Sequence, residues 1–222
     1  MAVVVINPNS TVPMTEAMVS EAKRAAPGLA FEGWTSHDGP ASIQGAADGQ
    51  RATEPLLKLV EAASEQGAEA IIIGCFDDTA LAAAASRAAC PVIGIGQAAY
   101  HYAALRQWRF SVVTTMQVSV PVLQDNIGAL GLGRYLARVR ASDVPVLALE
   151  SGDEDVTRQV LETAQTAVTY DGVDAIILGC AGMVHVTAAV RRAVDVAVID
   201  PVACAATCCS WLVTGSTAEP AG

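Results

Sequence analysis

Two cysteines in this sequence occupy equivalent places in a repeated motif. Cys75 ends the segment Glu69–Cys75 and Cys180 ends the segment Asp174–Cys180, at an offset of 105 residues. Each segment runs from an acidic residue through alanine and branched apolar residues to a glycine before the cysteine. A thiolate can remove a proton from carbon and a thiol can return one. Two such groups facing one ligand from opposite sides would meet the requirement of racemisation at a carbon acid.

The elements that must position these cysteines are strands followed by helices. Short β-branched runs such as Ala70–Ile73, ended by glycine, are typical of buried strands in a parallel sheet. Helix-like segments follow, Thr79–Ala89 in the first half and a helix from Ala181 to Val194 in the second. Ligands bind at the carboxyl ends of strands in open α/β sheets. We therefore expect each thiol at a helix N-terminus, where the dipole would lower its pKa.

Strand-like and helix-like stretches alternate along the whole chain, which favours the α/β class. The opening strand Ala2–Ile6 has a counterpart in Phe110–Thr115, so the second half repeats the first. We expect two similar pseudo-symmetric lobes, each a mostly parallel sheet flanked by helices. The predicted boundaries are 1–97 for the first lobe, completed by a C-terminal helix at 201–215, then 98–200 for the second lobe and 216–222 for a frayed tail.

The composition limits the kinds of partner that we expect for this protein. The 222 residues are 52% hydrophobic, enough for a large core, and the net charge is −10 with no basic stripe to track phosphates. No apolar run reaches the roughly 18–20 residues that a membrane span needs, and no basic leader precedes the first strand. We expect a cytoplasmic protein that binds a small molecule and neither nucleic acid nor membrane. The apolar composition also favours a homo-oligomer.

Polar residues lie at other strand ends. Asn9, Ser10 and Thr11 follow the first strand and could bind a small polar ligand or cap the next helix. Thr114 and Thr115 could orient a ligand or satisfy the sheet edge. The helix that follows Cys75 should be capped by Asp78, and His185 should face away from Cys180.

The remaining cysteines do not lie in a repeated motif. Small buried apolar side chains are the ordinary role of free cysteine, and we expect it for Cys90, Cys204, Cys208 and Cys209. The i, i+4 spacing on the last helix would bind a metal only with two further ligands, which the sequence does not offer. A glycine pair at Gly94 and Gly96 lacks the rest of a dinucleotide fingerprint. We therefore expect neither a metal nor a nucleotide cofactor.

The sequence resembles the Asp/Glu/hydantoin racemase superfamily, and within it the hydantoin/allantoin racemase branch. The motifs that carry the resemblance span nearly the whole chain: Ile6–Thr11, Gly74–Asp78, Val92–Gly96, Ser111–Thr115 and Leu178–Met183. The resemblance implies a two-lobe α/β fold, no cofactor, and proton transfer by Cys75 and Cys180. Together with the strand-end positions it assigns these substrate contacts: Asn9, Ser10, Thr11, Phe76, Asp77, Gly94, Thr114, Thr115, Ala181, Gly182 and Met183.

Three other functions remain open from the sequence. Free aspartate or glutamate as substrate would need cationic groups for a second carboxylate, and the strand-end motifs offer none. A maleate isomerase or malonate decarboxylase relative would share the fold, although the decarboxylase needs only one cysteine. A non-catalytic small-molecule binder would have no reason to keep reactive thiols, so thiol labelling should separate it from an enzyme.

Overall fold

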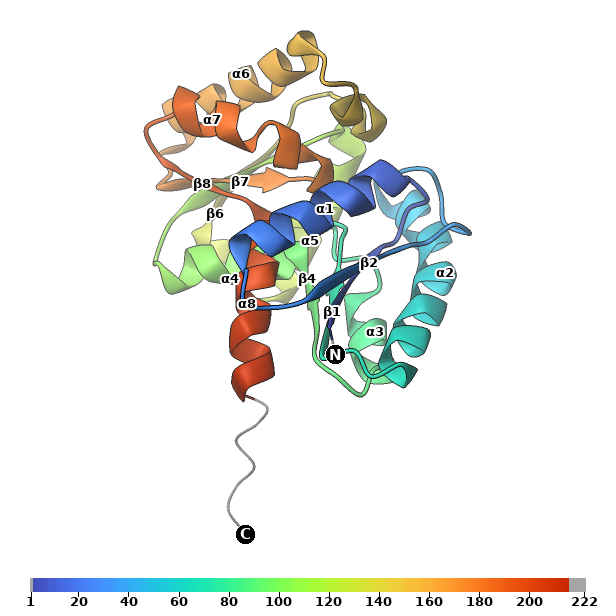
Figure 1. Cartoon of the computed structure of the whole chain (residues 1–222). Coiled ribbons are helices and arrows are strands. Elements are labelled where there is room, and N and C mark those ends of the chain that lie inside the picture. Colours follow the sequence, from blue (N-terminus) through green and yellow to red (C-terminus); the bar gives the residue numbers. More distant parts are fainter. Residues whose placement is uncertain (1, 216–222) are drawn as a thin grey trace.

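Two parallel sheets of four strands each form the frame of the protein, and the computed structural model describes residues 2–215 (Figure 1). The two-lobe α/β fold expected from the sequence is confirmed. The strand order is β2-β1-β3-β4 in the first sheet and β6-β5-β7-β8 in the second, so the two lobes share one topology. The strands are β1 (Val3–Asn7), β2 (Phe31–Thr35), β3 (Ala70–Ile73), β4 (Val92–Gly94), β5 (Phe110–Thr114), β6 (Leu136–Ala141), β7 (Ala175–Gly179) and β8 (Ala197–Ile199).

Helices connect successive strands and cover the sheets. The α-helices are α1 (Val12–Ala25), α2 (Ala46–Glu65), α3 (Leu81–Arg87), α4 (Ile95–Leu105), α5 (Val120–Ala129), α6 (Glu154–Asp171), α7 (Thr187–Ala193) and α8 (Pro201–Gly215). Short 3-10 segments complete the second lobe: η1 (Gln117–Ser119), η2 (Gly133–Tyr135), η3 (Val146–Ser151) and η4 (Ala181–His185). No helix among residues 2–215 is long and apolar enough to cross a membrane.

The central strands explain why the sequence folds into parallel sheets. Every residue of β1, β3, β5 and β7 is buried, as expected for strands covered by helices on both faces. β1 pairs in parallel with both β2 and β3, and β5 does the same with β6 and β7. The edge strand β2 has only one buried residue, Phe31, and the other four are exposed or half-buried. Burial therefore concentrates on the strands that carry the functional candidates.

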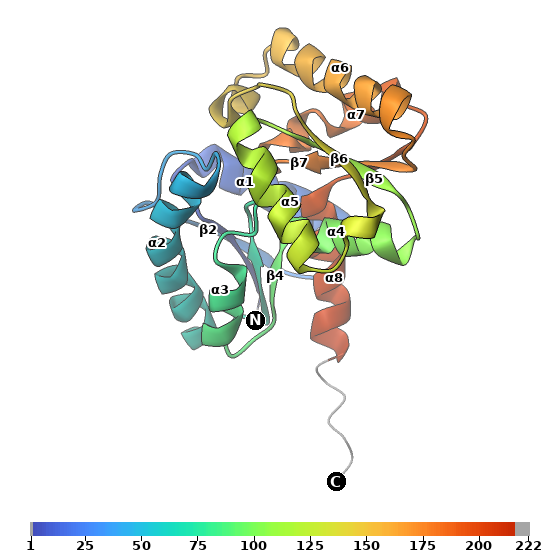
Figure 2. The same cartoon turned by 180° about the vertical axis from the view of Figure 1, so that it is seen from behind.

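Three helices hold the two lobes in their arrangement. α1 and α5 lie across the junction of the lobes, α1 in the front view and α5 in the view from behind (Figures 1 and 2). α8 packs against α1 and α4, so the last helix contacts elements that flank the first sheet. The lobe boundary near residue 98 and the C-terminal assignment stay predictions; β4 ends at Gly94 and β5 begins at Phe110. The predicted tail at 216–222 lies outside the described residues.

Two predicted helix starts are wrong. After Cys75 the chain makes a turn in which Asp78 and Ala80 adopt φ values of 51° and 52°, and α3 begins only at Leu81. After Cys180 the expected helix to Val194 is divided into η4 and α7 at Val186. Neither cysteine therefore begins an α-helix. The loop 36–45 leads from β2 to α2, which begins at Ala46.

Candidate active site

The topology creates a ligand-binding edge in each lobe. From β1 the chain moves to β2 on one side and then returns to β3 on the other, so the connections diverge between β1 and β3. The crevice at the carboxyl ends of such strands is where open α/β sheets bind ligands. Asn9 follows β1 and Cys75 follows β3; in the second lobe, Thr115 follows β5 and Cys180 follows β7. The repeated topology thus places one cysteine at the divergence point of each sheet.

One cavity of about 40 Å³ joins these two edges, and both thiols line it. The structure brings together most of the residues predicted from the strand-end motifs. The described lining residues are Asn9, Met14, Ile43, Gly74, Cys75, Phe76, Asp77, Thr114, Thr115, Ser119, Leu123, Val146, Gly179, Cys180 and Ala181. The volume is room for about three water molecules.

The glycine before each cysteine is required by close packing. A Cβ at Gly74 would lie 2.6 Å from the Sδ atom of Met18 on α1. A Cβ at Gly179 would lie 2.9 Å from the backbone oxygen of Val113 on β5. The repeated Gly-Cys pair is therefore a packing requirement at the strand end as well as a marker of the site.

The Cys75 thiol lies beside a carboxylate. Burial raises the pKa of Cys75 well above its usual range, and the charge of Asp77 and a hydrogen bond to its side chain raise it further. The backbone N–H of Asp77 and the hydroxyl of Thr79 act in the opposite direction and are outweighed. The lowered pKa expected from the sequence is wrong, because a turn and an acidic side chain stand where a helix N-terminus was expected.

The Cys180 thiol has a different set of neighbours. Burial raises its pKa to about 12, while the backbone N–H groups of Gly182 and Met183 lower it and the charges of Glu150 and Asp77 raise it. The expectation of a lowered pKa is wrong here too, because η4 offers backbone donors but the side chain is almost fully buried. After burial, the largest influence on the pKa of Cys180 is a backbone donor, which favours the thiolate, whereas the largest influence on Cys75 is the Asp77 carboxylate, which favours the protonated thiol.

The turn after β1 is ordered by Asn7 and Asn9. The amide of Asn7 donates to Asn9 Oδ1 at 3.0 Å, and the backbone N–H of Thr11 donates to the same oxygen at 2.9 Å. The Nδ2 of Asn9 faces only the sulfur of Met14, at 3.5 Å. Because a thioether is a weak acceptor, the Asn9 amide keeps N–H capacity for a ligand in the cavity.

Several predicted contacts lie away from the cavity. The Thr11 hydroxyl donates to the backbone oxygen of Ala41, and the Ser10 backbone N–H donates to that of Pro40, so both residues hold the loop 36–45. Neither Gly182 nor Met183 is among the lining residues; both contribute backbone N–H groups that face the Cys180 thiol. They act on the thiol rather than on the cavity wall.

Gly94 has a structural role that the sequence did not reveal. It lies outside the cavity lining, and a Cβ there would meet the Oδ1 atom of Asp78 at 2.0 Å. The Asp78 carboxylate accepts the backbone N–H groups of Gly96 and Gln97, and so caps α4. The prediction that Asp78 caps the helix after Cys75 is therefore wrong: the left-handed turn directs it to α4.

In the second lobe, Thr114 and Thr115 take different roles. Both line the cavity, but the Thr114 hydroxyl donates to the backbone oxygen of Gly179 at 3.1 Å and so joins β5 to β7. Ser119 lines the same side and was not predicted. The other lining residues that the sequence analysis did not name as contacts are apolar or glycine: Met14, Ile43, Gly74, Leu123, Val146 and Gly179. Of these, only Gly74 and Gly179 are distinguished in the sequence, by the repeated Gly-Cys pair.

Two hydrogen bonds between the lobes close the cavity. The Nδ2 of Asn126, on α5, donates to the backbone oxygen of Asp77 at 2.6 Å. The backbone N–H of Val146 donates to Oε1 of Gln44 at 2.8 Å. Gly45, next to Gln44, has a φ of 83°, and a Cβ added there would lie 3.0 Å from the Val118 backbone oxygen. The loop 36–45 thus lies directly on the second lobe.

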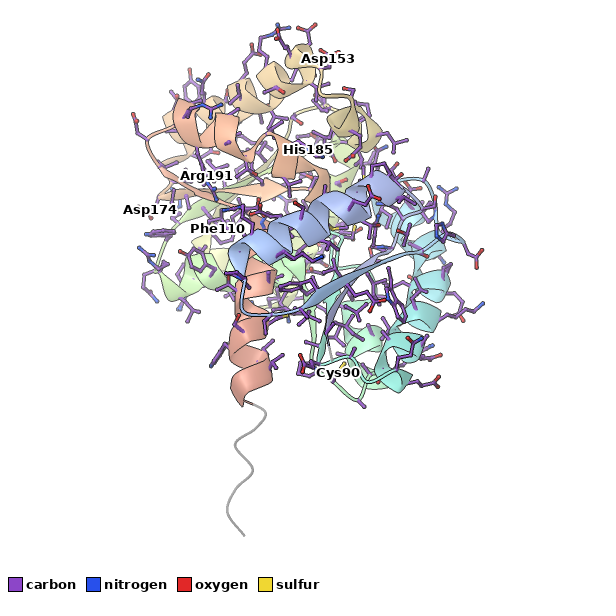
Figure 3. All side chains as sticks on the ribbon, viewed as in Figure 1. Cys90, Phe110, Asp153, Asp174, His185 and Arg191 are labelled. Carbon is purple, nitrogen blue, oxygen red and sulfur yellow. The ribbon has the colours of Figure 1, made fainter. Side chains whose placement is uncertain are left out.

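The remaining cysteines and histidines lie elsewhere. Cys90 is at the end of the first lobe remote from the second, whereas His185 lies on η4, which packs on α1 (Figure 3). His185 Nε2 is 3.8 Å from Glu150 Oε2, its side chain is 46% exposed, and it is not among the residues that line the cavity. Within residues 2–215, no group of three or more His, Cys, Asp or Glu side chains could hold a metal ion.

The sequence as a whole matches the family model described as Asp/Glu/Hydantoin racemase over residues 3–209. A hydantoin racemase of Rhizobium meliloti is 41% identical over 203 residues, covering 90% of this chain and 83% of that protein. A hydantoin racemase of Pseudomonas sp. (strain NS671) is 31% identical over 203 residues, covering 91% and 82%. The chain belongs to the Asp/Glu/hydantoin racemase family. It is accordingly an isomerase, a racemase that acts on a small molecule.

Solved structures agree with this assignment. Allantoin racemase from Klebsiella pneumoniae has a TM-score of 0.90 and 36% identity, covering 97% of this chain and 89% of that chain. Allantoin racemase from Pseudomonas fluorescens has a TM-score of 0.92 and 30% identity, covering 97% and 92%. A glutamate racemase from Francisella tularensis, at 17% identity and a TM-score of 0.73, is similar in fold alone.

Proposed function

We propose that this racemase interconverts the enantiomers of 5-substituted hydantoins or allantoin, with Cys75 and Cys180 as the two acid/base groups. The observation that carries the proposal is the single cavity lined by both thiols, each at the carboxyl end of a central strand of its own lobe. The carbon to be racemised carries a proton α to a ring carbonyl. One thiolate removes that proton from one face, and the opposite thiol delivers a proton to the other face.

The neighbours of the two thiols favour different protonation states. Backbone N–H groups of Gly182 and Met183 favour the Cys180 thiolate, while the Asp77 carboxylate favours the Cys75 thiol. We therefore assign Cys180 as the base and Cys75 as the acid for one enantiomer. Turnover of that enantiomer leaves the reverse arrangement, which is the starting state for the opposite one. Both thiol pKa values are raised by burial, so the reactive form is scarce in the empty cavity.

The enolate that forms after proton removal needs a hydrogen-bond donor. The Asn9 amide is buried at the end of β1 and its Nδ2 has only the Met14 sulfur as partner. We assign it to the developing oxyanion, a role in which a preorganised donor is worth about 10²–10³ in kcat. A cytoplasmic location and a homo-oligomeric state stay predictions from the sequence.

The test follows the optical rotation of an enantiopure 5-alkylhydantoin, and of allantoin, in D₂O. The wild type should bring the rotation to zero while deuterium enters the α-carbon. Cys75→Ser and Cys180→Ser should each lose racemisation, and a variant that still exchanges deuterium on a single enantiomer would assign the faces. Cys90→Ser is the matched control, because Cys90 lies outside the cavity. Folded wild type that racemises neither substrate would refute the substrate assignment.

Free aspartate or glutamate is the weaker alternative. A second substrate carboxylate calls for a cation, and none of the described residues that line the cavity is lysine, arginine or histidine. Racemisation of either amino acid at a rate above that of the hydantoins would reverse the order of the two proposals. A non-catalytic binder, which the sequence left open, is set aside because the chain belongs to a racemase family.

A further inference from the structure

The cavity contains one carboxylate with no cation to balance it. Among the described lining residues, Asp77 is the single aspartate or glutamate, and the others are apolar, small, neutral polar or thiol side chains. No ion pair within residues 2–215 involves Asp77. Its charge instead raises the pKa of the Cys75 and Cys180 thiols. An uncompensated carboxylate in a mostly apolar cavity attracts positive charge and N–H donors more strongly than it would in water.

Asp77 is held in place by neighbours that leave part of its carboxylate unused. Its backbone oxygen accepts the Asn126 amide from α5, and Oδ1 accepts the hydroxyl of Thr79 at 2.5 Å. On the other side, a Cβ at Gly49 on α2 would lie 3.5 Å from Oδ2, which is ordinary van der Waals contact and not a hydrogen bond. A carboxylate accepts about four hydrogen bonds, and the Thr79 hydroxyl and the Cys75 thiol account for two. Because Asp77 lines the cavity, a ligand bound there can use the remaining capacity.

We propose that Asp77 determines substrate specificity by selecting hydantoins whose 5-substituent ends in a cationic amine. The inference rests on the proposed function and names the substrate class within it. An ammonium at the end of a short chain would pair with the Asp77 carboxylate while the ring lies between the thiols. A substituent ending in a carboxylate would meet like charge in the same space, and an alkyl substituent would gain neither attraction nor repulsion.

Three hydantoins of similar size measure this selectivity: 5-(3-aminopropyl)-, 5-butyl- and 5-(2-carboxyethyl)hydantoin. In the wild type, kcat/KM for racemisation should fall in that order. Asp77→Asn keeps the shape and the acceptor for Thr79 but removes the charge. It should lower the aminopropyl-to-butyl ratio of kcat/KM at least tenfold and raise the carboxyethyl-to-butyl ratio.

The kcat/KM ratios distinguish substrate selection by Asp77 from an effect of Asp77 on the Cys75 thiol. Removal of the Asp77 charge also lowers the pKa of Cys75, which changes the rate with all three substrates and cancels in the ratios. Asp125→Asn is the matched control: it removes the same charge from an exposed position beside Asn126, and should leave the ratios unchanged. Ratios that Asp77→Asn leaves unchanged, or a wild type that prefers the butyl or carboxyethyl compound, would overturn the proposal.

Binding gives a readout that does not need turnover. Calorimetric titration of the three hydantoins into wild type and Asp77→Asn should give the same order of affinity and the same reversal. Absence of racemisation of all three hydantoins and of allantoin by the folded wild type would refute the proposed function. Equal affinity for the three compounds would refute the role of Asp77 even in an active racemase.

Discussion

Asp78 and Gly96 are joined by a hydrogen bond of 3.0 Å that runs from the turn after Cys75 to the first residues of α4. The same carboxylate accepts the backbone N–H of Gln97 at 2.7 Å. Because Asp78 adopts a left-handed φ of 51°, its side chain turns away from α3 and toward the helix that follows β4. The turn that carries Cys75 is therefore anchored to the neighbouring strand connection.

Asp78→Asn should change how stability depends on pH. Burial raises the pKa of Asp78 well above its usual range, although the two N–H donors lower it. As pH rises past about 3.9, the unfolded chain loses this proton before the folded protein does, so the wild type loses stability up to the folded pKa. The asparagine side chain does not titrate, so the variant lacks this pH-dependent loss of stability. Its stability relative to wild type, measured by urea unfolding at pH 4 and pH 8, should increase with pH; a constant difference would contradict the assignment.

Gly94→Ala should destabilise the first lobe. The added Cβ would lie 2.0 Å from Oδ1 of Asp78, so the α4 cap must shift or break. Steric overpacking of this kind costs typically about 1–3 kcal/mol of unfolding free energy. Gly28→Ala is the control, since its Cβ would meet nothing within 4 Å and should change the unfolding free energy little. Equal unfolding midpoints for the two variants would refute the cap as the cause.

Alkylation of the cavity thiols should be slow at neutral pH and should accelerate with pH. Only the thiolate reacts, and the pKa of Cys180 is raised to about 12 and that of Cys75 well above its usual range. Labelling by iodoacetamide, followed by peptide mass spectrometry from pH 7 to 9, should increase about tenfold per pH unit at both sites. Rapid, pH-independent labelling of either thiol would contradict the raised pKa values. Slow labelling at pH 7 therefore does not separate an enzyme from a binder, contrary to the expectation from sequence.

Gln44→Ala should open the cavity more often. The hydrogen bond from the Val146 N–H to the Gln44 side chain joins the loop 36–45 to the second lobe. A bond of this kind contributes about 0.5–1.5 kcal/mol, which corresponds to a roughly 2- to 13-fold change in the open population. The alkylation rate of Cys75 should rise by that factor at fixed pH. Gln124→Ala, an exposed position on α5, is the control and should leave the rate unchanged.

The same closure bears on substrate binding. The cavity of about 40 Å³ has room for about three water molecules. A hydantoin ring with its two carbonyl oxygens is more than twice as large as this, counted in heavy atoms. Binding must therefore separate the loop 36–45 from Val146, and KM should respond to Gln44→Ala more than kcat does. A change confined to kcat would place the effect on the chemistry rather than on access.

The sequence predicts the fold and the position of the thiols because both depend on local patterns. β-branched runs that end in Gly-Cys specify β3 and β7, and the repeat at an offset of 105 residues places them at the same point of two sheets. The position of both cysteines at one cavity follows from that topology. The family resemblance rests on the same strand-end motifs.

What could not be predicted depends on contacts distant in the sequence. Asp78 bonds to residues 18 and 19 positions later, through a left-handed turn that aspartate adopts without a local signal. Ile43 and Val146 become cavity wall only because the loop 36–45 contacts the second lobe. The raised thiol pKa values likewise arise from burial, which no local pattern reports. A helix N-terminus was the wrong local inference at both sites.

The packing of α8 against α1 and α4 has a consequence for biosynthesis. Met18 and Ala22 of α1 share a hydrophobic cluster with Val202 and Ala205 of α8, although about 180 residues separate the two helices in the chain. During translation, the apolar face of α1 leaves the ribosome long before the helix that covers it. This face of α1 therefore stays uncovered until the last helix has been synthesised. A fragment released before residue 201 would expose that face and be prone to aggregation.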